Sequence, residues 1–274
     1  MTKCDVCMAK ERIDKVLSHH GFGSRKDVKA MLRRERVLVN GNVVYDPGFQ
    51  VDIGADDVRV DGECVALAHD VYIMLNKCAD VVCANRDGEH RTVFDLLDDS
   101  LRHTFLGGDL HCMGRLDIDT EGLLILTTDG KLTHTLMSPK THVPKTYAVR
   151  LARAVDAQLR QAYVEKFARG FWVDREGNEA GFDCQPATLV WDSDAGASSV
   201  PLALWDGFDC LLTIFEGKFH QVKRMFSQVG NEVSYLKRVA MGRLFLDPRL
   251  KPGEYRGLSA EERELLQSHG RRSE

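Results

Sequence analysis

The sequence predicts an α+β protein in which a small module of two helices and a hairpin precedes a larger domain of mixed strands and helices. Two short helix-period patterns and a hairpin signal occupy residues 13–44. From about residue 70, apolar strand-type runs alternate with helical patterns, as in an α+β domain. A chain of 274 residues, of which 43% are hydrophobic, can form two such domains. We place them at 10–68 and 69–264.

The composition favours a cytoplasmic protein without a membrane partner, and we expect a monomer. No apolar run approaches the roughly 20 residues that a membrane-spanning helix needs, and the start MTKCDVCMAK lacks a secretory signal. Eight cysteines at irregular spacings favour reduced thiols. Cys4 and Cys7 form the one C-x-x-C pair, and no second pair of ligands completes a zinc site, so we expect no metal.

The net charge is −4, but the two signs are segregated along the chain. Residues 10–36 hold nine Lys/Arg and four Asp/Glu, whereas residues 37–70 hold one and seven. Residues 131–153 hold five basic residues and no acidic one. The basic segments are therefore where a polyanion would bind.

The first module begins with an amphipathic pattern from Ile13 to His20, which the glycines at 21 and 23 end. Ser24 and Asp27 have the spacing of a capping box and predict the start of a second helix. At about 100° per residue, four basic side chains form one stripe on this helix. They are Arg25, Lys29, Arg33 and Arg36. Taken alone, such a stripe is more often a solvated helix face.

A hairpin is predicted next, because Asn40-Gly41 separates two β-branched runs and is a strong type I′ turn signal. In the larger domain we expect strands at 71–75, 122–128, 145–151 and 209–215.

Helices are expected at 156–169 and 220–229. The first has Leu159, Tyr163 and Phe167 on its core face. The second has Val222, Met225, Phe226 and Val229 on its core face, while His220, Lys223 and Ser227 lie off it. Ser259 and Glu262 form another capping box before a short polar helix.

The stretch GRLDIDTEGLLILTTDG places Asp117, Asp119 and Glu121 just before an apolar run. An EF-hand would need a bidentate Glu at its twelfth position, but that position is Thr128. A P-loop, a dinucleotide glycine motif, H-E-x-x-H and G-x-S-x-G are all absent. The chemistry that is left is that of a carboxylate acting without a cofactor, although a lone loop aspartate is usually only solvated.

The segment ERIDKVLSHHGFGSRKDVKAMLRRERVLVNGNVV resembles the S4 RNA-binding domain along nearly its whole length. In that family the second helix and the following loop grip structured RNA. The resemblance implies that five residues contact the RNA backbone, which positions an RNA without reading its sequence. They are Arg25, Lys29, Arg33, Arg36 and Asn40.

GRLDIDTEGLLILTTDG, with VPKTYAVRL and EGKFHQVKRMF downstream, resembles the RsuA-type family of pseudouridine synthases, which carry an S4 domain before the catalytic domain. The resemblance covers roughly residues 10–262, and YIMLNK and KPGEYRGLSAEE fit the branch that modifies the small ribosomal subunit. It implies a mainly antiparallel catalytic sheet, no cofactor, and ribosomal RNA or a ribosome-assembly particle as partner.

The family's catalytic aspartate falls on Asp117, its K-T-Y tyrosine on Tyr147, and the basic residue that pairs with the aspartate on Lys223. Many relatives have Arg at this last position, and Lys lacks the planar fork needed for a bidentate pair. Cys78 stands where the family usually has Pro. Further basic residues are expected along the RNA path, namely Lys77, Arg115, Lys145, Lys218, His220 and Arg224.

The resemblance implies isomerisation of a uridine to pseudouridine in ribosomal RNA, most readily the 16S RNA of the small subunit. Asp117 would start it, either by attack on ribose C1′ or through a glycal, and both routes stay open. The alternatives are a large-subunit (23S) synthase and a non-catalytic assembly factor. A pure binding protein would have no need of Asp117, Tyr147 and Lys223 together.

Overall fold

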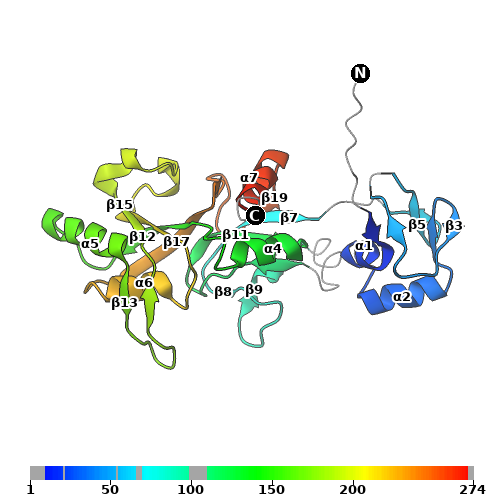
Figure 1. The fold of residues 1–274 in the computed structure, drawn as a ribbon, viewed down its shortest axis with the longest axis horizontal. Helices are drawn as coiled ribbons and strands as arrows, with labels where there is room; N and C mark the ends of the chain where they lie inside the picture. The colour runs from blue at the N-terminus through cyan, green and yellow to red at the C-terminus, as the bar shows by residue number, and fades with distance from the viewer. Residues whose placement is uncertain (1–9, 21, 54, 66–69, 99–109, 271–274) are drawn as a thin grey trace, which may run out of the picture. The chain divides into compact units, whose positions relative to one another are not determined.

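The computed structural model describes residues 10–20, 22–53, 55–65, 70–98 and 110–270. The chain divides into two compact units, one built mainly from residues up to Val71 and the other mainly from Tyr72 onward (Figure 1). The expected α+β class is confirmed. Cys4 and Cys7 lie outside the described residues. Within the described ranges, no helix is both long and apolar enough to cross a bilayer.

The first unit contains two helices in contact, α1 (Ile13–His19) and α2 (Arg25–Arg33). Four strands form a sheet in the order β3-β2-β5-β6, and β1 pairs with β4. Their bounds are Glu11–Arg12 (β1), Val37–Val39 (β2), Asn42–Val43 (β3), Gln50–Val51 (β4), Val58–Val60 (β5) and Glu63–Cys64 (β6). The aliphatic faces of helices and strands meet in one core, which includes Ile13, Leu17, Val28, Leu32, Val37 and Val58.

Local signals in this unit are confirmed. The Ser24 hydroxyl accepts from the Asp27 amide and the Asp27 carboxylate accepts from the Ser24 amide, which completes the capping box. The turn residues Asn40 and Gly41 have φ angles of 50° and 81°, the left-handed pair that a type I′ turn needs.

The basic stripe is shorter than expected, because α2 ends at Arg33 and the chain turns at Glu35, whose φ is 57°. Arg36 therefore lies beyond the helix. Its guanidinium pairs with both carboxylate oxygens of Asp61. The expectation that Arg36 belongs to the helix stripe is wrong.

The second unit is built on a nine-stranded sheet. Seven strands follow the order β15-β16-β12-β17-β11-β7-β19, with β10 beside β11 and β18 beside β17. Their bounds are Tyr72–Lys77 (β7), His111–Met113 (β10), Glu121–Thr127 (β11), Lys145–Leu151 (β12), Thr188–Trp191 (β15), Cys210–Ile214 (β16), Val233–Met241 (β17), Leu244–Phe245 (β18) and Tyr255–Gly257 (β19). The β11–β17 pair is parallel, whereas β12, β15, β16 and β19 pair antiparallel with their neighbours.

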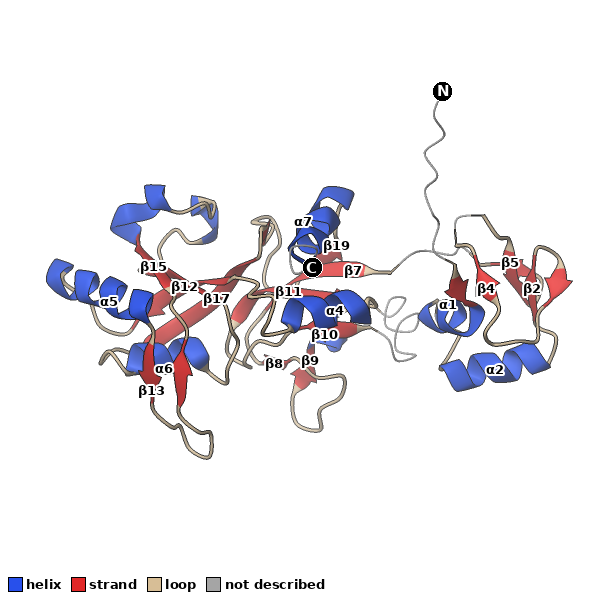
Figure 2. Cartoon of the chain, in the orientation of Figure 1, coloured by secondary structure: helices blue, strands red, loops and turns tan. Residues whose placement is uncertain are grey.

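Among the described residues, four α-helices accompany this sheet, and α5, α6 and α7 contact β15, β17 and β18 respectively (Figure 2). Their bounds are Gly130–Met137 (α4), Ala157–Arg169 (α5), Gln221–Ser227 (α6) and Ala260–Gly270 (α7). Short 3-10 segments lie at Val93–Leu96, Asp192–Ala197 and Leu202–Leu204. Two small pairs complete the unit, namely β8 (Val81–Val82) with β9 (Arg91–Thr92), and β13 (Phe171–Val173) with β14 (Phe182–Cys184).

Gly122 fixes how β11 meets β17. Its φ is 100°, and an added Cβ would lie 2.3 Å from the carbonyl oxygen of Arg238 on the neighbouring strand. Only glycine allows this close backbone approach. The parallel pairing therefore starts directly after the loop that carries Asp117.

The helices of the second unit follow the sequence pattern with local exceptions. Tyr163 and Phe167 are buried in α5, but Leu159 is 42% exposed, so its assignment to the core face is wrong. Leu159 lies in the first turn of α5, and its amide donates to the Asp156 cap. The Ser259–Glu262 capping box before α7 is confirmed.

Candidate active site

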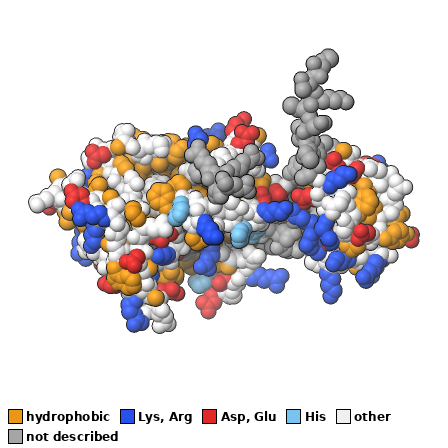
Figure 3. All heavy atoms as spheres, in the orientation of Figure 1, with side chains coloured by type: hydrophobic (Ala, Val, Ile, Leu, Met, Phe, Trp, Pro, Cys, Tyr) orange, Lys and Arg blue, Asp and Glu red, His pale blue; other side chains and the backbone are white. Residues whose placement is uncertain are grey.

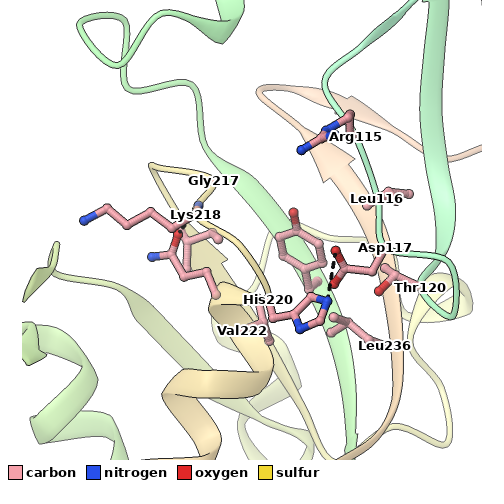
Figure 4. Close-up of a pocket in the computed structure, with 12 residues that line it drawn as sticks. Arg115, Leu116, Asp117, Thr120, Gly217, Lys218, His220, Val222 and Leu236 are labelled. Atoms are coloured by element: carbon pink, nitrogen blue, oxygen red, sulfur yellow. Dashed lines mark hydrogen bonds and ion pairs between the residues drawn. The ribbon is translucent and has the colours of Figure 1, made fainter. Parts of the chain in front are cut away.

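An open pocket lies on the second unit (Figure 4). Its volume, which includes the solvent space at its mouth, is about 420 Å³. The loop between β10 and β11 contributes Arg115 and Asp117, and β12 contributes Tyr147. The segment between β16 and α6 contributes Lys218 and His220. The pocket therefore joins the three sequence motifs, which are far apart along the chain.

The loop that carries Asp117 is held by a buried lysine. The Lys77 ammonium, at the end of β7, donates to the carbonyls of Asp117, Ile118 and Thr120 at 3.0, 3.1 and 2.9 Å, and to that of Cys78 at 3.1 Å. Lys77 is 0% exposed, and burial lowers the pKa of its ammonium. The expectation that Lys77 lines the RNA path is wrong, because its ammonium is buried and hydrogen-bonded to these carbonyls.

Two nitrogen-bearing side chains flank the Asp117 carboxylate. Lys223 places its Nζ 3.7 Å from Asp117 Oδ2, and His220 places its Nε2 4.0 Å from Asp117 Oδ1. Figure 4 shows the imidazole and the carboxylate turned toward each other. The other nitrogen of His220, Nδ1, lies 3.3 Å from Glu176. Asp117 is thus flanked by an ammonium and an imidazole.

Lys223 makes its hydrogen bonds to a different carboxylate. Its Nζ lies 2.6 and 2.8 Å from the two oxygens of Asp119. Burial tends to raise the pKa of Asp119, but the hydrogen bond and charge of Lys223 outweigh it, so this pKa lies below its ordinary value. The sequence pairs Lys223 with Asp117 alone, whereas the structure gives it two carboxylate partners.

Tyr147 lies in β12, is largely buried, and lines the pocket. In register it lies opposite Leu212 of β16 and Arg238 of β17. Strands on both sides fix its backbone, so the ring has a defined place beside Asp117.

His220 has a left-handed backbone, with φ of 46° and ψ of 30°, directly before α6. Its ring stacks on Phe219 with centroids 3.7 Å apart. This conformation is uncommon for a residue other than glycine and marks a constrained site. The sequence gives His220 only as an RNA-path residue.

Arg224 does not lie on the RNA path. It is 5% exposed, and its guanidinium donates to the carbonyls of Asp174, Ala180 and Phe219. It therefore ties α6 to the segment between β13 and β14. Its spacing along the helix could not reveal this, because the carbonyls of Asp174 and Ala180 come from a distant hairpin.

The remaining basic candidates of this unit are more accessible. Lys218 is exposed, donates to the Asp183 carbonyl at 2.8 Å and lies over the Phe182 ring. Lys145 is half-buried, and burial together with the nearby Arg238 lowers its pKa to about 8. Arg115 lines the pocket, with its guanidinium away from Asp117 in Figure 4.

In the first unit, Arg25, Lys29 and Arg33 are exposed on α2, and Figure 3 shows Lys and Arg side chains gathered over this helix. Arg25 lies 3.7 Å from the buried Asp14. The amide of Asn40 is engaged within the unit, donating to Asp56 and accepting from the Asp57 amide.

Two residues of the site are not predicted from the sequence. Asp119 is considered from the sequence only as a metal ligand, and Glu176 belongs to none of the sequence motifs. The D-x-D spacing on one turn is a signal for the former, since both carboxylates can reach one cation. Glu176 has no local signal, because it reaches His220 from the β13–β14 connection. No group of three or more metal-ligating side chains occurs within the parts of the chain that the structure describes.

The RNA-binding type of module and the carboxylate pocket define an enzyme that acts on RNA, and comparison with known proteins agrees. The chain matches the RNA pseudouridylate synthase family over residues 71–228 and the S4 domain over residues 11–58. The chain belongs to the RNA pseudouridylate synthase family and is an RNA pseudouridine synthase with an S4 domain.

Particular relatives cover nearly the whole chain. It is 42% identical over 257 residues to the uncharacterized RNA pseudouridine synthase YtzG of Bacillus subtilis, covering 93% of this chain and 98% of that protein. It is 36% identical over 252 residues to ribosomal small subunit pseudouridine synthase A of Escherichia coli K12, covering 92% and 97%. A crystal structure of a pseudouridylate synthase aligns with a TM-score of 0.59 at 34% identity, covering 93% and 99%.

Proposed function

We propose that this protein converts one uridine of small-subunit ribosomal RNA to pseudouridine and that Asp117 starts the reaction. The observation that carries this proposal is the pocket in which Asp117 and Tyr147 meet, with Lys223 3.7 Å from the carboxylate. The small-subunit target rests on the relatives named ribosomal small subunit pseudouridine synthase A, which are 34–41% identical over more than nine tenths of this chain.

The reaction rearranges atoms within one nucleotide. The bond between ribose C1′ and uracil N1 breaks, the base turns, and C1′ joins C5. The proton on C5 is then removed and N1 gains one, so the product is an isomer of the substrate. A carboxylate suits the first step, as a nucleophile at C1′ or as a base on the way to a glycal.

The named residues have separate roles. Asp117 acts as a carboxylate, and the ammonium of Lys223 lies 3.7 Å from its Oδ2. The Tyr147 ring lines the pocket, where it would stack on the turned base, and its hydroxyl is a candidate for removing the C5 proton. The uridine must leave its stack to reach this pocket, which costs a few kcal/mol in a helix and less in a loop.

The two domains divide the work. Residues 10–68 dock structured RNA through the exposed cations of α2, and residues 69–264 carry out the isomerisation. We place the protein in the cytoplasm, where ribosomal RNA or an assembling ribosomal subunit is its partner, and expect it to act as a monomer.

The test is to map pseudouridines in ribosomal RNA from cells that lack this protein. One small-subunit pseudouridine should disappear and return on complementation with the wild-type gene. Complementation with the Asp117→Asn variant should not restore it. Loss of a large-subunit site instead would contradict the proposed target, and an unchanged map would contradict action on ribosomal RNA.

A further inference from the structure

One ammonium serves two carboxylates of the same short loop. Lys223 hydrogen-bonds both oxygens of Asp119 at 2.6 and 2.8 Å but stays 3.7 Å from Asp117. The Asp119 side chain is 61% exposed, against 31% for Asp117 and 24% for Lys223. Asp119, the more solvated carboxylate, therefore hydrogen-bonds Lys223, and Asp117 lies beside this ion pair.

The position of Asp119 is set by the backbone. Lys77 holds the carbonyls on both sides of it, those of Ile118 and Thr120. The amide of Thr120 donates to the Asp117 carbonyl at 3.1 Å, which closes a turn around Asp119. Both carboxylates are therefore presented to Lys223 from one fixed turn.

A lysine needs such a partner more than an arginine would. Its ammonium is a compact point charge on a flexible four-carbon stem, whereas a guanidinium orients itself through a planar fork. With Asp117 alone as partner, Lys223 would close to hydrogen-bond distance and engage an oxygen that has to react. Asp119 gives the ammonium a second anchor.

We propose that Asp119 is a positioning residue that holds the Lys223 ammonium beside Asp117 at a distance too long for a hydrogen bond. This inference rests on the proposed role of Asp117. Other groups also face Asp117 or line its pocket, namely His220, which Glu176 contacts, Tyr147, Arg115 and Lys218. None of them hydrogen-bonds Lys223 among the residues that the structure describes.

The first arm of the test follows single-turnover pseudouridine formation from pH 5 to 9 in Asp119→Asn. Lys223 should then close on Asp117, and the rate at neutral pH should fall by about tenfold. The acidic limb of the profile should move to lower pH, because a negative charge is gone and the cation is nearer. RNA affinity should stay within about twofold, and Asp119→Glu should recover part of the rate.

A double-variant cycle asks whether Asp119 acts through Lys223. Adding Asp119→Asn to Lys223→Met should change the residual rate far less than it changes wild type. Asp192→Asn is the matched control, because Asp192 is an exposed aspartate paired with Arg160 at 2.7 Å and lies outside the pocket. It should leave rate and profile unchanged.

The second arm does not depend on catalysis. An amine-acylating reagent, followed by peptide mass spectrometry, should label Lys223 faster in the Asp117→Asn/Asp119→Asn double variant than in Asp117→Asn, because the amine then loses its hydrogen-bonded anion and no other carboxylate of the turn replaces it. This measurement remains valid even if Asp117→Asn proves active and the proposed function fails. An unchanged labelling rate would overturn the pairing, and an unmoved acidic limb would overturn the positioning role whatever the labelling shows.

Discussion

Asp117 is the residue on which the proposed chemistry depends. Asp117→Asn should reduce product formation at least about 1,000-fold while leaving RNA affinity nearly unchanged, because it removes the reacting charge and little of the shape. Single-turnover assays and equilibrium binding to the same RNA measure the two effects. Appreciable turnover by this variant would remove Asp117 from its assigned role.

Cys83 carries chemistry of its own outside the pocket. The hydrogen bond from Cys112 lowers the pKa of the Cys83 thiol below its ordinary value, although burial works in the opposite direction. The amide of Leu116 also donates to its sulfur at 3.4 Å. The thiolate form of this half-buried side chain is therefore favoured over that of an ordinary cysteine.

Alkylation should report this state. Cys83 should react with iodoacetamide with a midpoint at lower pH than that of the exposed Cys64, as followed by peptide mass spectrometry. Cys112→Ala should slow the reaction at pH 7, since the donor that stabilises the thiolate is gone. The exposed Cys64 is the internal reference. The same midpoint in both proteins would argue against the Cys112 hydrogen bond.

Asp247 links several elements of the second unit. It follows β18 and accepts from Arg249 and from Arg256 of β19, both at 2.8 Å to Oδ2. Arg256 in turn pairs with Glu262 of α7 at 2.7 Å. The hydrogen bonds from Arg249, reinforced by Arg256, hold the pKa of Asp247 well below its usual range.

This network should make stability depend on pH. Because the folded pKa is depressed, the contribution is present above the ordinary aspartate pKa of about 3.9 and is lost as pH falls toward the folded value. Asp247→Asn should lower the free energy of unfolding by about 1–3 kcal/mol at pH 7. Urea titrations at several pH values should show the gap to wild type narrowing below about pH 4. A gap that does not change with pH would contradict the linkage.

The elements that the sequence predicts correctly are those with local causes. The Ser24 and Ser259 caps and the Asn40-Gly41 turn depend on residues within a few positions of one another. The errors concern side chains whose partners are distant. Lys77 and Arg224 look like surface cations in sequence, and only the folded chain brings carbonyls to them.

At the scale of the whole molecule, docking and chemistry are assigned to different domains. Neutralising Arg25, Lys29 and Arg33 together should weaken RNA binding and reduce the magnitude of its salt slope by about 2 to 3, since each phosphate contact releases somewhat less than one counterion. The single-turnover rate at saturating RNA should change much less. Binding across a salt series, with the rate measured on the same variant, tests both expectations.

Arg36 supplies the matched control, because its guanidinium is already paired with Asp61 within the first unit. Arg36→Gln should change the salt slope less than any one of the three α2 substitutions. If the triple variant binds as wild type does at every salt concentration, the α2 cations form only a solvated face. If its saturated rate collapses while affinity holds, the module also orients the uridine.

The grip of Lys77 on carbonyl oxygens has a consequence for how freely the Asp117 loop can vary. Because Lys77 binds main-chain carbonyls, its hydrogen bonds do not depend on which side chains the loop carries. The backbone path of the loop is therefore fixed by a residue of β7, forty positions earlier in the chain. Ile118, which is 36% exposed, can then be exchanged for many residues without moving its neighbours. In a saturation library selected for activity, position 118 should accept many residues, whereas position 77 should accept few. Tolerance to substitution will then depend on whether a side chain makes these hydrogen bonds, and not on its distance from the pocket.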